Sequence, residues 1–337
     1  MRRGICVAGN MIVDTLYRVD NYPSEGTLVH IKEGIEYATG GAVTNVIVDL
    51  AKLDPSLPLQ ALGRIGEDDK GDLILRTLGQ YPNIDTSSVK RSGDSAFTIV
   101  MNDETTRQRT FFTYLGANGH FTEDDIDWSK VEGGIFHIGY LLLLNALDQP
   151  DEAFGSKMAR LLCHAQEHGL KTSIDVVSEA GDRFTRLVPP AMKYTDYCVI
   201  NEYEAEMTTG IPLRDGEDRL IRENLPGALR RMKELGVSTW AVIHSAEGGF
   251  GLDEAGNYVE RPSLCLPKGY IKGATGAGDA FCAGVLLAAA DGRPLAEGID
   301  LGIASATAAL SEAGATEGMR DRAAVLDLLG QYERRSL

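Results

Sequence analysis

The residues best suited to chemistry lie in KGATGAGDAF, residues 272–281, which runs directly into the apolar segment CAGVLLAAA. Gly276, Ala277 and Gly278 carry almost no side chain, so a ligand can approach their backbone closely. A helix that begins at about Asp279 would point its first N–H groups, and the positive end of its dipole, at that ligand. Such an arrangement suits a phosphoryl group whose negative charge builds in the transition state.

Asp279 itself would repel a bound phosphate, so we expect it to accept a proton from an attacking hydroxyl as a general base. The decapeptide alone leaves a second interpretation open, because Asp is also a common helix N-cap. Two other nucleotide-binding motifs are absent from the sequence: there is no G-x-x-x-x-G-K-[ST] loop, and no G-x-G-x-x-G follows the first expected strand. A P-loop is therefore excluded, and a Rossmann dehydrogenase is disfavoured.

The elements that must position these groups alternate along most of the chain. Runs of buried-strand type are expected at 5–9, 59–66, 134–139, 171–177, 197–201 and 238–245. Helical periodicity is found at 42–53, 69–81, about 150–168, near 217–235, 278–290 and 295–314. This alternation predicts an α/β fold: a doubly wound, mostly parallel sheet with helices on both faces.

Two segments, 15–36 and 94–114, break this alternation. They contain no good helical pattern, and the second has a DETT turn between two runs of alternating polarity. We expect them to form a small antiparallel β lid. The remaining residues, 1–14, 37–93 and 115–337, are expected to form one α/β body.

Composition narrows the possible partners and compartment. The net charge is −16, which would repel the phosphates of nucleic acids and anionic membranes, although a nucleotide can still bind to backbone N–H groups. The five cysteines are dispersed with no C-x-x-C pair, which is typical of reduced thiols in a cytoplasmic protein. The start of the sequence, MRRGICVAGN, predicts a first strand and not a signal peptide.

Other polar residues lie where an α/β fold presents ligand-binding groups. Asp14 follows the first strand and could bind two neighbouring sugar hydroxyls, or it could be a solvated turn residue. Gly40 and Gly41 precede a helix with Asn45 in its first turn, a pattern that would let a polyol approach the backbone but also fits a simple helix start.

Asn201 and Glu204 follow another strand, and a carboxylate there could hold Mg²⁺ through water. The alternative is a capping pair at the start of a helix. His137 and His244 lie inside apolar strands, where hydrogen-bonded buried histidines are expected. Arg107 and Arg109 lie in the second lid segment, where they could reach a substrate or only solvent.

Six segments, collinear along nearly the whole chain, resemble motifs of the ribokinase/PfkB carbohydrate kinase family. One such motif is weakly specific, whereas six in the family's order are strongly specific. The segments are GNMIVD (9–14), TGGAVTN (39–45), GRIGEDDKGDLI (63–74), GAN (116–118), NEYE (201–204) and GAGDAF (276–281).

The resemblance implies a ribokinase-like fold and phosphorylation of a sugar-type hydroxyl with ATP and Mg²⁺. It implies that Asp279 is the base and that the backbone of Gly276–Asp279 forms an anion hole. The substrate would be bound by Asp14, Gly40, Gly41, Asn45, Arg109 and Asn118. The nucleotide would be bound by Asn201, Glu204, His244, Gly249 and Thr275, with Glu204 holding Mg²⁺ through water. Lid strands of this family often pair between two chains, so a homodimer is expected.

The sequence departs from the family pattern at three places. The family usually reads D-T-x-G-A-G-D, and Gly273 and Ala274 replace its first two residues, so K⁺ is not among the expected cofactors. HSAEGG (244–249) keeps only Gly249 of the nucleotide-side motif, and HIGYLLLL (137–144) lacks the acid typical of ribose-specific members. A nucleoside kinase of the same fold and a non-catalytic sugar or nucleotide sensor remain as alternatives.

Overall fold

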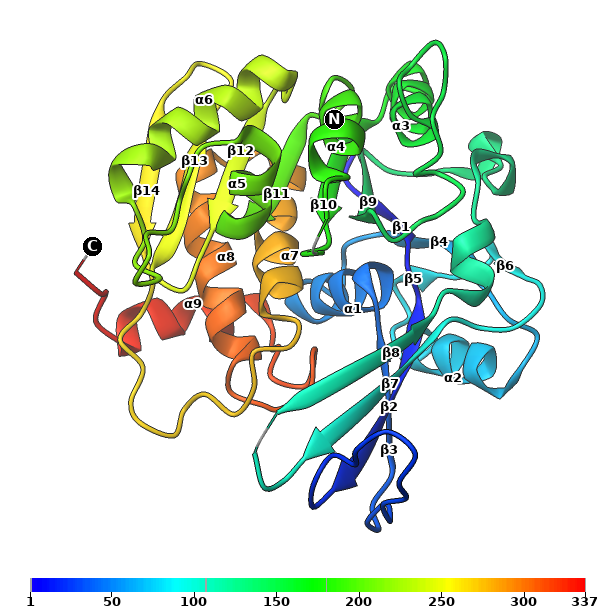
Figure 1. Ribbon diagram of the computed structural model, residues 1–337. Helices are drawn as coiled ribbons and strands as arrows, with labels where there is room; N and C mark the ends of the chain where they lie inside the picture. Colours follow the sequence, from blue (N-terminus) through cyan, green and yellow to red (C-terminus); the bar gives the residue numbers. More distant parts are fainter. Residues whose placement is uncertain (1, 107, 180, 337) are drawn as a thin grey trace.

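The computed structural model describes residues 2–106, 108–179 and 181–336. Within them the apolar strand segments form one large sheet with the strand order β14-β13-β12-β11-β10-β9-β1-β4-β5, and β6 pairs with β4 (Figure 1). The strands are β1 (Ile5–Gly9), β4 (Leu59–Ile65), β5 (Ile84–Asp85), β6 (Val89–Arg91), β9 (Ile135–Leu141), β10 (Lys171–Val176), β11 (Tyr197–Asn201), β12 (Trp240–His244), β13 (Gly248–Leu252) and β14 (Tyr258–Pro262). All pairs from β5 to β12 are parallel, which confirms the predicted fold class.

Helices cover both faces of this sheet, because its central strands are apolar on both sides. The helices are α1 (Ala42–Leu53), α2 (Asp69–Leu78), α3 (Lys157–Glu167), α4 (Phe184–Met192), α5 (Glu202–Thr209), α6 (Leu225–Leu235), α7 (Ala277–Ala290), α8 (Leu295–Ala309) and α9 (Arg322–Gln331). One buried core joins α1, α2 and α7–α9 to the sheet, and a second joins α3–α6 to the other face. None of the helices in the described segments is long and apolar enough to cross a membrane.

The lid is a separate sheet of four strands that extends away from the body beyond α1 and α2 (Figure 1). Its strands are β2 (Ile12–Val19), β3 (Glu36–Gly40), β7 (Phe97–Asp103) and β8 (Arg109–Tyr114), in the order β3-β2-β7-β8. The predicted antiparallel lid is confirmed in two of its three pairs. The third pair, β2 with β7, runs parallel; these strands come from segments far apart in the chain and are not joined by a hairpin. The lid sheet also begins at Ile12 and its β3 ends at Gly40, so it takes in residues that the sequence assigned to the body.

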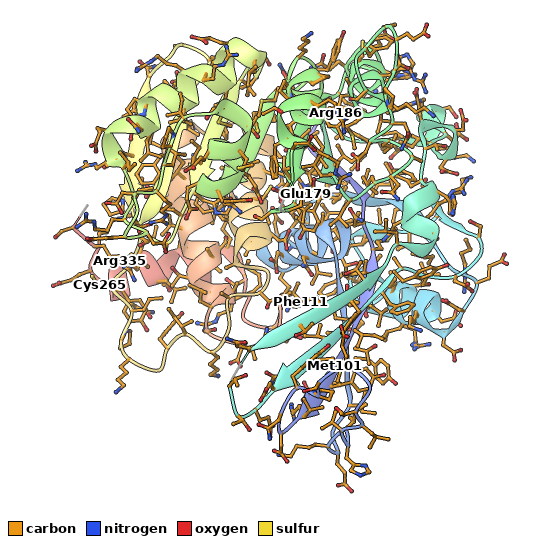
Figure 2. All side chains as sticks on the ribbon, viewed as in Figure 1. Met101, Phe111, Glu179, Arg186, Cys265 and Arg335 are labelled. Atoms are coloured by element: carbon orange, nitrogen blue, oxygen red, sulfur yellow. The ribbon has the colours of Figure 1, made fainter. Side chains whose placement is uncertain are left out.

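Both faces of the outer lid strand are open to solvent. Phe111 is 60% and its neighbour Phe112 is 50% exposed, although adjacent residues of a strand point to opposite faces. Figure 2 shows Phe111 and Met101 on this sheet, apart from the helices of the body. The lid therefore offers apolar surface that the described chain leaves uncovered.

Two predicted helices are shorter than their sequence patterns. The segment expected at about 150–168 is helical only over α3, because Ser156 caps it by accepting from the N–H of Ala159 at 3.1 Å. The segment near 217–235 is helical over α6 and is preceded by a loop closed by the bridge between Arg214 and Leu220. Strands β13 and β14, which add an antiparallel edge to the sheet, were not predicted.

Candidate active site

The polar centre of the molecule lies where the strand order of the large sheet reverses. Strand β1 has β4 on one side and β9 on the other, and the sheet continues outward from both. In open α/β sheets, ligands bind outside the carboxyl ends of the strands at such a point. Tyr140, near the end of β9, and Asp279, in the first turn of α7, meet there: the tyrosine hydroxyl lies 2.7 Å from a carboxylate oxygen.

Helix α7 begins at Ala277, slightly earlier than the sequence predicts, and Gly276 is its N-cap in the left-handed region at φ 77°. A Cβ at Gly276 would also lie 2.5 Å from the carbonyl oxygen of Ala315. Ala277–Asp279 thus form the first turn, whose N–H groups lack partners within the helix. The N–H of Ala277 makes one long hydrogen bond of 3.3 Å, to the carbonyl of Ala274. The helix start therefore places backbone donors beside the Asp279 carboxylate.

The carboxylate of Asp279 is nearly buried, at 6% exposure, and is held by two side chains. Asn45 in the first turn of α1 donates from Nδ2 to Oδ2 at 2.8 Å. The Tyr140 hydroxyl donates to Oδ1 at 2.7 Å and lies 2.9 Å from Oδ2. Burial raises the pKa of Asp279 to about 6, while hydrogen bonds from Tyr140 and Asn45 act in the opposite direction. A carboxyl group with such a pKa is ionised at neutral pH and can still take up a proton.

Three further buried carboxyl groups approach this centre: Asp175 of β10, Glu204 of α5 and Asp49 of α1. Burial, then repulsion by Glu204 and by Asp279, holds the pKa of Asp175 well above its usual range. Burial also raises the pKa of Glu204 to about 7. Clustered carboxyl groups of this kind are relieved by a nearby cation. Among the described residues, however, no group of three or more His, Cys, Asp or Glu side chains could hold a metal ion.

Asn201 and Glu204 form the capping box that the sequence offered as an alternative to metal binding. Asn201 accepts from the backbone N–H of Glu204 at 2.9 Å, and Glu204 accepts from that of Asn201 at 3.0 Å. The other carboxylate oxygen of Glu204 accepts from the Ser178 hydroxyl at 2.7 Å. The cap fixes the orientation of Glu204 beside Asp175, so the structural role does not remove the carboxylate from the site.

The structure brings together four of the predicted substrate residues. Gly41 is the N-cap of α1 and Asn45 lies in its first turn. Asp14, on β2 at the base of the lid, approaches Gly40 so closely that a Cβ there would lie 2.9 Å from Asp14 Oδ2. Burial raises the pKa of Asp14 to about 6, and a hydrogen bond from Thr98 acts against that rise. The base of the lid therefore places Asp14 against Gly40, which directly precedes the N-cap of the helix whose Asn45 contacts Asp279.

The other two predicted substrate residues are placed differently. Asn118 is fully buried, and its side-chain amide is hydrogen-bonded to the backbone of Met11. Its Oδ1 accepts from the Met11 N–H at 3.3 Å, and its Nδ2 donates to the Met11 carbonyl at 3.0 Å. It therefore holds the loop after β1. Arg109 of β8 is paired with Asn102 of β7, which is paired in turn with Arg18 of β2. Arg18 lies four residues beyond Asp14, about 13 Å along the strand. Arg109 does not join the site in this structure, and Arg107 lies outside the described residues.

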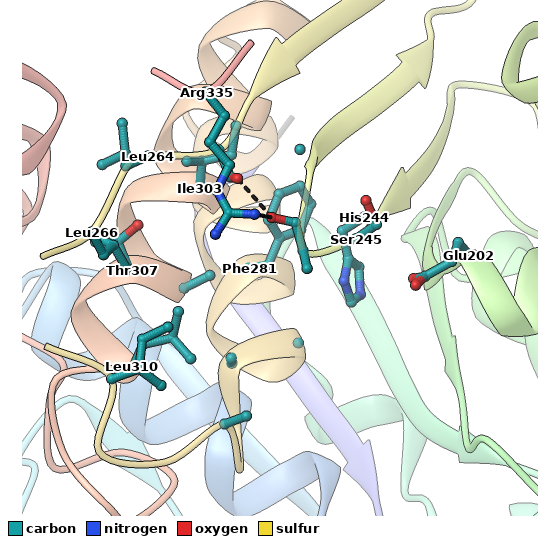
Figure 3. Close-up of a pocket in the computed structure, with 18 residues that line it drawn as sticks. Glu202, His244, Ser245, Leu264, Leu266, Phe281, Ile303, Thr307, Leu310 and Arg335 are labelled. Carbon is teal, nitrogen blue, oxygen red and sulfur yellow. Dashed lines mark hydrogen bonds between the residues drawn. The ribbon is translucent and has the colours of Figure 1, made fainter. Parts of the chain in front are cut away.

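An apolar cavity of about 360 Å³ adjoins the start of α7 (Figure 3). Ala277, Gly278 and Phe281 of α7 form part of its wall, and Ile303, Ala306 and Leu310 line the side of α8. The rim includes Ser245 and Arg335, whose guanidinium group donates to the carbonyl of Ala246 at 3.3 Å. This combination of apolar walls and few polar groups is typical of a small-molecule site.

Of the predicted nucleotide residues on this side, only His244 lines the cavity. Burial lowers the pKa of His244 to about 4, so its ring is neutral, and it lies 5.0 Å from the Phe281 ring. Gly249 does not line the cavity; a Cβ there would lie 2.6 Å from Ile299, so this glycine permits the close packing of α8 on β13. Its neighbour Gly248 lines the cavity instead. Thr275 is exposed beside the cavity and does not line it.

Four residues at the site were not predicted from the sequence: Tyr140, Asp175, Asp49 and Arg335. Asp175 could have been found by the rule that singled out Asp14, because it ends an apolar strand run in KTSIDVV. Tyr140 lies in HIGYLLLL, a segment noted in the sequence only because it lacks an acidic residue.

His137 is buried as predicted, and its Nδ1 is hydrogen-bonded to the Ser173 hydroxyl at 3.0 Å. Its Nε2 has no partner among the described residues.

Comparison with known proteins shows the family of this chain. The family model described as "pfkB family carbohydrate kinase" matches residues 2–322. The chain therefore belongs to the pfkB family of carbohydrate kinases, as the six motifs implied.

Relatives of this chain differ in the acceptor that their names state. The ribokinase of Arabidopsis thaliana is 25% identical over 333 residues, 96% of this chain and 80% of that protein. The nucleoside kinase of Methanocaldococcus jannaschii is 23% identical over 309 residues, 91% of this chain and 90% of that protein.

Solved structures of two such proteins share the fold. The structure of Arabidopsis thaliana ribokinase with ribose and ATP has a TM-score of 0.79 at 23% identity and covers 98% of this chain and 99% of that one. The Methanocaldococcus jannaschii nucleoside kinase structure has a TM-score of 0.74 at 19% identity, with 98% and 99% covered. At these identities the likeness shows the ribokinase fold and does not identify a substrate.

Proposed function

We propose that the protein is an ATP-dependent kinase that phosphorylates a hydroxyl of a sugar or sugar derivative. The observation that carries this proposal is the buried Asp279 carboxylate at the N-terminus of α7. It contacts Asn45 beside the predicted substrate residues, while the adjacent Gly278 lines the apolar cavity. A base with an acceptor site on one side and a cavity suited to a nucleotide base on the other fits phosphoryl transfer.

In the proposed reaction, Asp279 accepts the proton of the acceptor hydroxyl. The acceptor oxygen forms a bond to the γ-phosphorus of ATP, and the bond from that phosphorus to the β–γ bridging oxygen breaks, so that ADP leaves with the electron pair. The N–H groups of Gly276–Asp279 stabilise the negative charge on the transferred group, helped by the dipole of α7. Asp14, Gly41 and Asn45 orient the acceptor.

Mg²⁺ fits the acidic side of this site. Glu204 and Asp175 are buried side by side with raised pKa values, so a cation held through water would relieve their repulsion. When bound, Mg²⁺ supplies positive charge that neutralises the phosphates of ATP. Gly273 and Ala274, which replace the family's Asp and Thr, are the reason that we assign no K⁺ to the reaction.

We also infer a homodimer that pairs through the lid. Strand β8 is an open edge of the lid sheet, and exposed apolar residues such as Phe111 and Phe112 lie on it. A cytoplasmic location fits the five unpaired cysteines.

The second candidate is a nucleoside kinase. Similarity to the Methanocaldococcus jannaschii nucleoside kinase favours it, as does the absence of an acid in HIGYLLLL. Asp14 and Asn45 serve either acceptor, because a polyol and a nucleoside both offer vicinal hydroxyls.

The proposal is tested by measuring ADP release with ATP, Mg²⁺ and a panel of sugars, polyols and nucleosides, each compared with a reaction lacking acceptor. We expect acceptor-dependent ADP release and a product heavier by one phosphoryl group in mass spectrometry. If acceptors bind while ADP release stays at background, the third possibility, a sugar or nucleotide sensor, replaces the kinase. A response confined to nucleosides would select the second candidate.

A further inference from the structure

The Tyr140 side chain is fixed in contact with the proposed base. Its hydroxyl lies 2.7 Å from Oδ1 and 2.9 Å from Oδ2 of Asp279. Its backbone N–H donates to Oδ1 of Asn10 at 2.7 Å, and Asn10 Nδ2 donates to the carbonyl of Leu143 at 3.3 Å. Because Asn10 binds the backbone of Tyr140 and of Leu143, the loop after β1 sets the position from which the phenol reaches the carboxylate.

The hydrogen bonds on Asp279 leave little room for an acceptor. A carboxylate offers about four lone-pair positions on its two oxygens. The Tyr140 hydroxyl has a single proton but lies within 2.9 Å of both oxygens, so it occupies one position on each of them. Asn45 Nδ2 occupies the second position of Oδ2, at 2.8 Å. The position that remains free is on Oδ1. An incoming hydroxyl that gives its proton to Asp279 is thereby directed to one oxygen of the carboxylate.

We propose that Tyr140 is a positioning residue for the base: its hydroxyl stabilises the ionised carboxylate of Asp279 and directs the free lone pair of Oδ1 to the acceptor hydroxyl. This inference rests on the proposed function and deepens it. Tyr140 lies outside all six family-like motifs, so its role is assigned from contact geometry alone.

The surroundings of Asp279 offer no substitute for this donor. Within the described residues, no Lys or Arg side chain forms an ion pair with Asp279. The groups around it are neutral or acidic: Asn45 and Asp49 of α1, Tyr140 of β9, Asp175 of β10, Cys282 of α7 and the neutral His244 of β12, which packs against Gly278. Loss of the phenol hydroxyl therefore leaves a buried anion among acids with one donor fewer, and the carboxyl group should take up its proton at higher pH.

The test is Tyr140→Phe, which removes only the hydroxyl. Protonation of Asp279 is followed by ¹³C NMR of carboxyl-labelled Asp, with the signal assigned from its loss in Asp279→Asn, and the pH profile of kcat/KM is measured in parallel. We expect the midpoint of the Asp279 titration and the acid limb of the profile to rise together by about one to two pH units, because a hydrogen bond to a charged group changes a protonation constant about ten- to hundredfold.

Tyr203→Phe is the matched control, because the Tyr203 hydroxyl donates at 3.1 Å to the carbonyl of Glu179, away from Asp279. It should leave both midpoints unchanged. An unchanged Asp279 titration in Tyr140→Phe would overturn the inference. A raised titration midpoint in a protein that phosphorylates no acceptor would support the contact to Asp279 and overturn the proposed function, so the two failures are distinguishable.

Discussion

The first turn of α7 serves two regions that are built in opposite ways. On one side, Asp279 is held by hydrogen bonds from Asn45 and Tyr140 among further buried acids. On the other side, Gly278 and Phe281 line an apolar cavity of about 360 Å³. Hydrogen bonds to a buried charge are individually strong, whereas apolar contacts are individually weak and act in sum. A single substitution should therefore lower kcat in the polar region and weaken nucleotide binding in the apolar region.

Apart from removal of the Asp279 carboxylate, the largest effect is expected for Gly276→Ala, which tests the point where the two regions meet. The new Cβ would lie 2.5 Å from the carbonyl of Ala315 and would displace the first N–H groups of α7. Loss of one donor from an anion hole costs about 10²–10³ in kcat, so we expect kcat to fall at least about 100-fold. Steady-state kinetics measures the change.

The control for that experiment is Gly210→Ala. Gly210 also has a left-handed backbone, at φ 72°, but has nothing within 4 Å of its ideal Cβ position. It should lose about 1–2 kcal/mol of stability and keep its kcat. If the two variants had similar kcat values, the anion-hole assignment would be wrong.

Ala306→Leu tests the apolar region. The larger side chain of α8 would occupy part of the cavity opposite Phe281, so we expect the KM for ATP to rise by about tenfold or more while kcat changes less than about threefold. Ala323→Leu, at an exposed position of α9, is the control for overall stability. A loss of kcat at unchanged KM would contradict the division between the two regions.

Asp49→Asn tests how much a buried carboxyl group on the polar side of α7 lowers the stability of the protein. Asp49 is fully buried, and neither of its carboxylate oxygens has a hydrogen-bond partner among the described residues. Burial, followed by repulsion from Asp279, holds its pKa well above the usual range, with Lys52 acting against and Glu317 adding to the rise. A carboxyl group whose pKa is higher in the folded than in the unfolded chain lowers stability as pH rises above about 4.

We therefore expect Asp49→Asn to be more stable than the unaltered protein by about 1–3 kcal/mol at pH 8, with the difference vanishing towards pH 4. Denaturant unfolding at several pH values measures it. Asp327→Asn, at an exposed position of α9, should show no such pH-dependent gain. Equal pH dependence in both variants would mean that Asp49 does not carry this cost.

The smallest effect is expected when K⁺ replaces Na⁺ in the assay. Gly273 stands where the family usually has Asp, and a Cβ there would lie 2.8 Å from the carbonyl of Ala313, so the 313–315 segment packs closely on this turn. We expect the rate to change by less than about twofold, because the charged ligand of a cation is missing. A several-fold increase of the rate with K⁺ would contradict this prediction and show that a monovalent cation acts in the polar region.

The body of the fold could be predicted because its strands and helices have clear periodicities of their own. The lid could be predicted as a small sheet with antiparallel pairs, but the parallel pairing of β2 with β7 could not, since it depends on which edges meet in space. Strands β13 and β14 contain glycines and polar residues that weaken the strand pattern, so the antiparallel edge of the sheet was missed.

Local motifs single out Asp279 after its glycines and Asn45 after Gly41, and the structure places these two side chains in contact. A motif does not reveal contacts with residues that are distant in sequence. Asn118 lies in a motif, but its side-chain amide is hydrogen-bonded to the backbone of Met11. Gly249 also lies in a motif, and Ile299 packs so closely against it that a Cβ would not fit. Tyr140 carries no motif, and its hydroxyl meets Asp279 only because β9 and α7 end at the same point of the sheet.

The most direct test of the account is a single-turnover experiment with Asp279→Asn and the unaltered protein, using γ-³²P-labelled ATP and the acceptor selected by the panel, with ATP binding measured on the same samples. We predict that both proteins bind ATP with similar affinity and that label transfer is slower in the variant by at least about 10³-fold. Transfer by Asp279→Asn within about tenfold of the unaltered rate would contradict the assignment of Asp279 as the base.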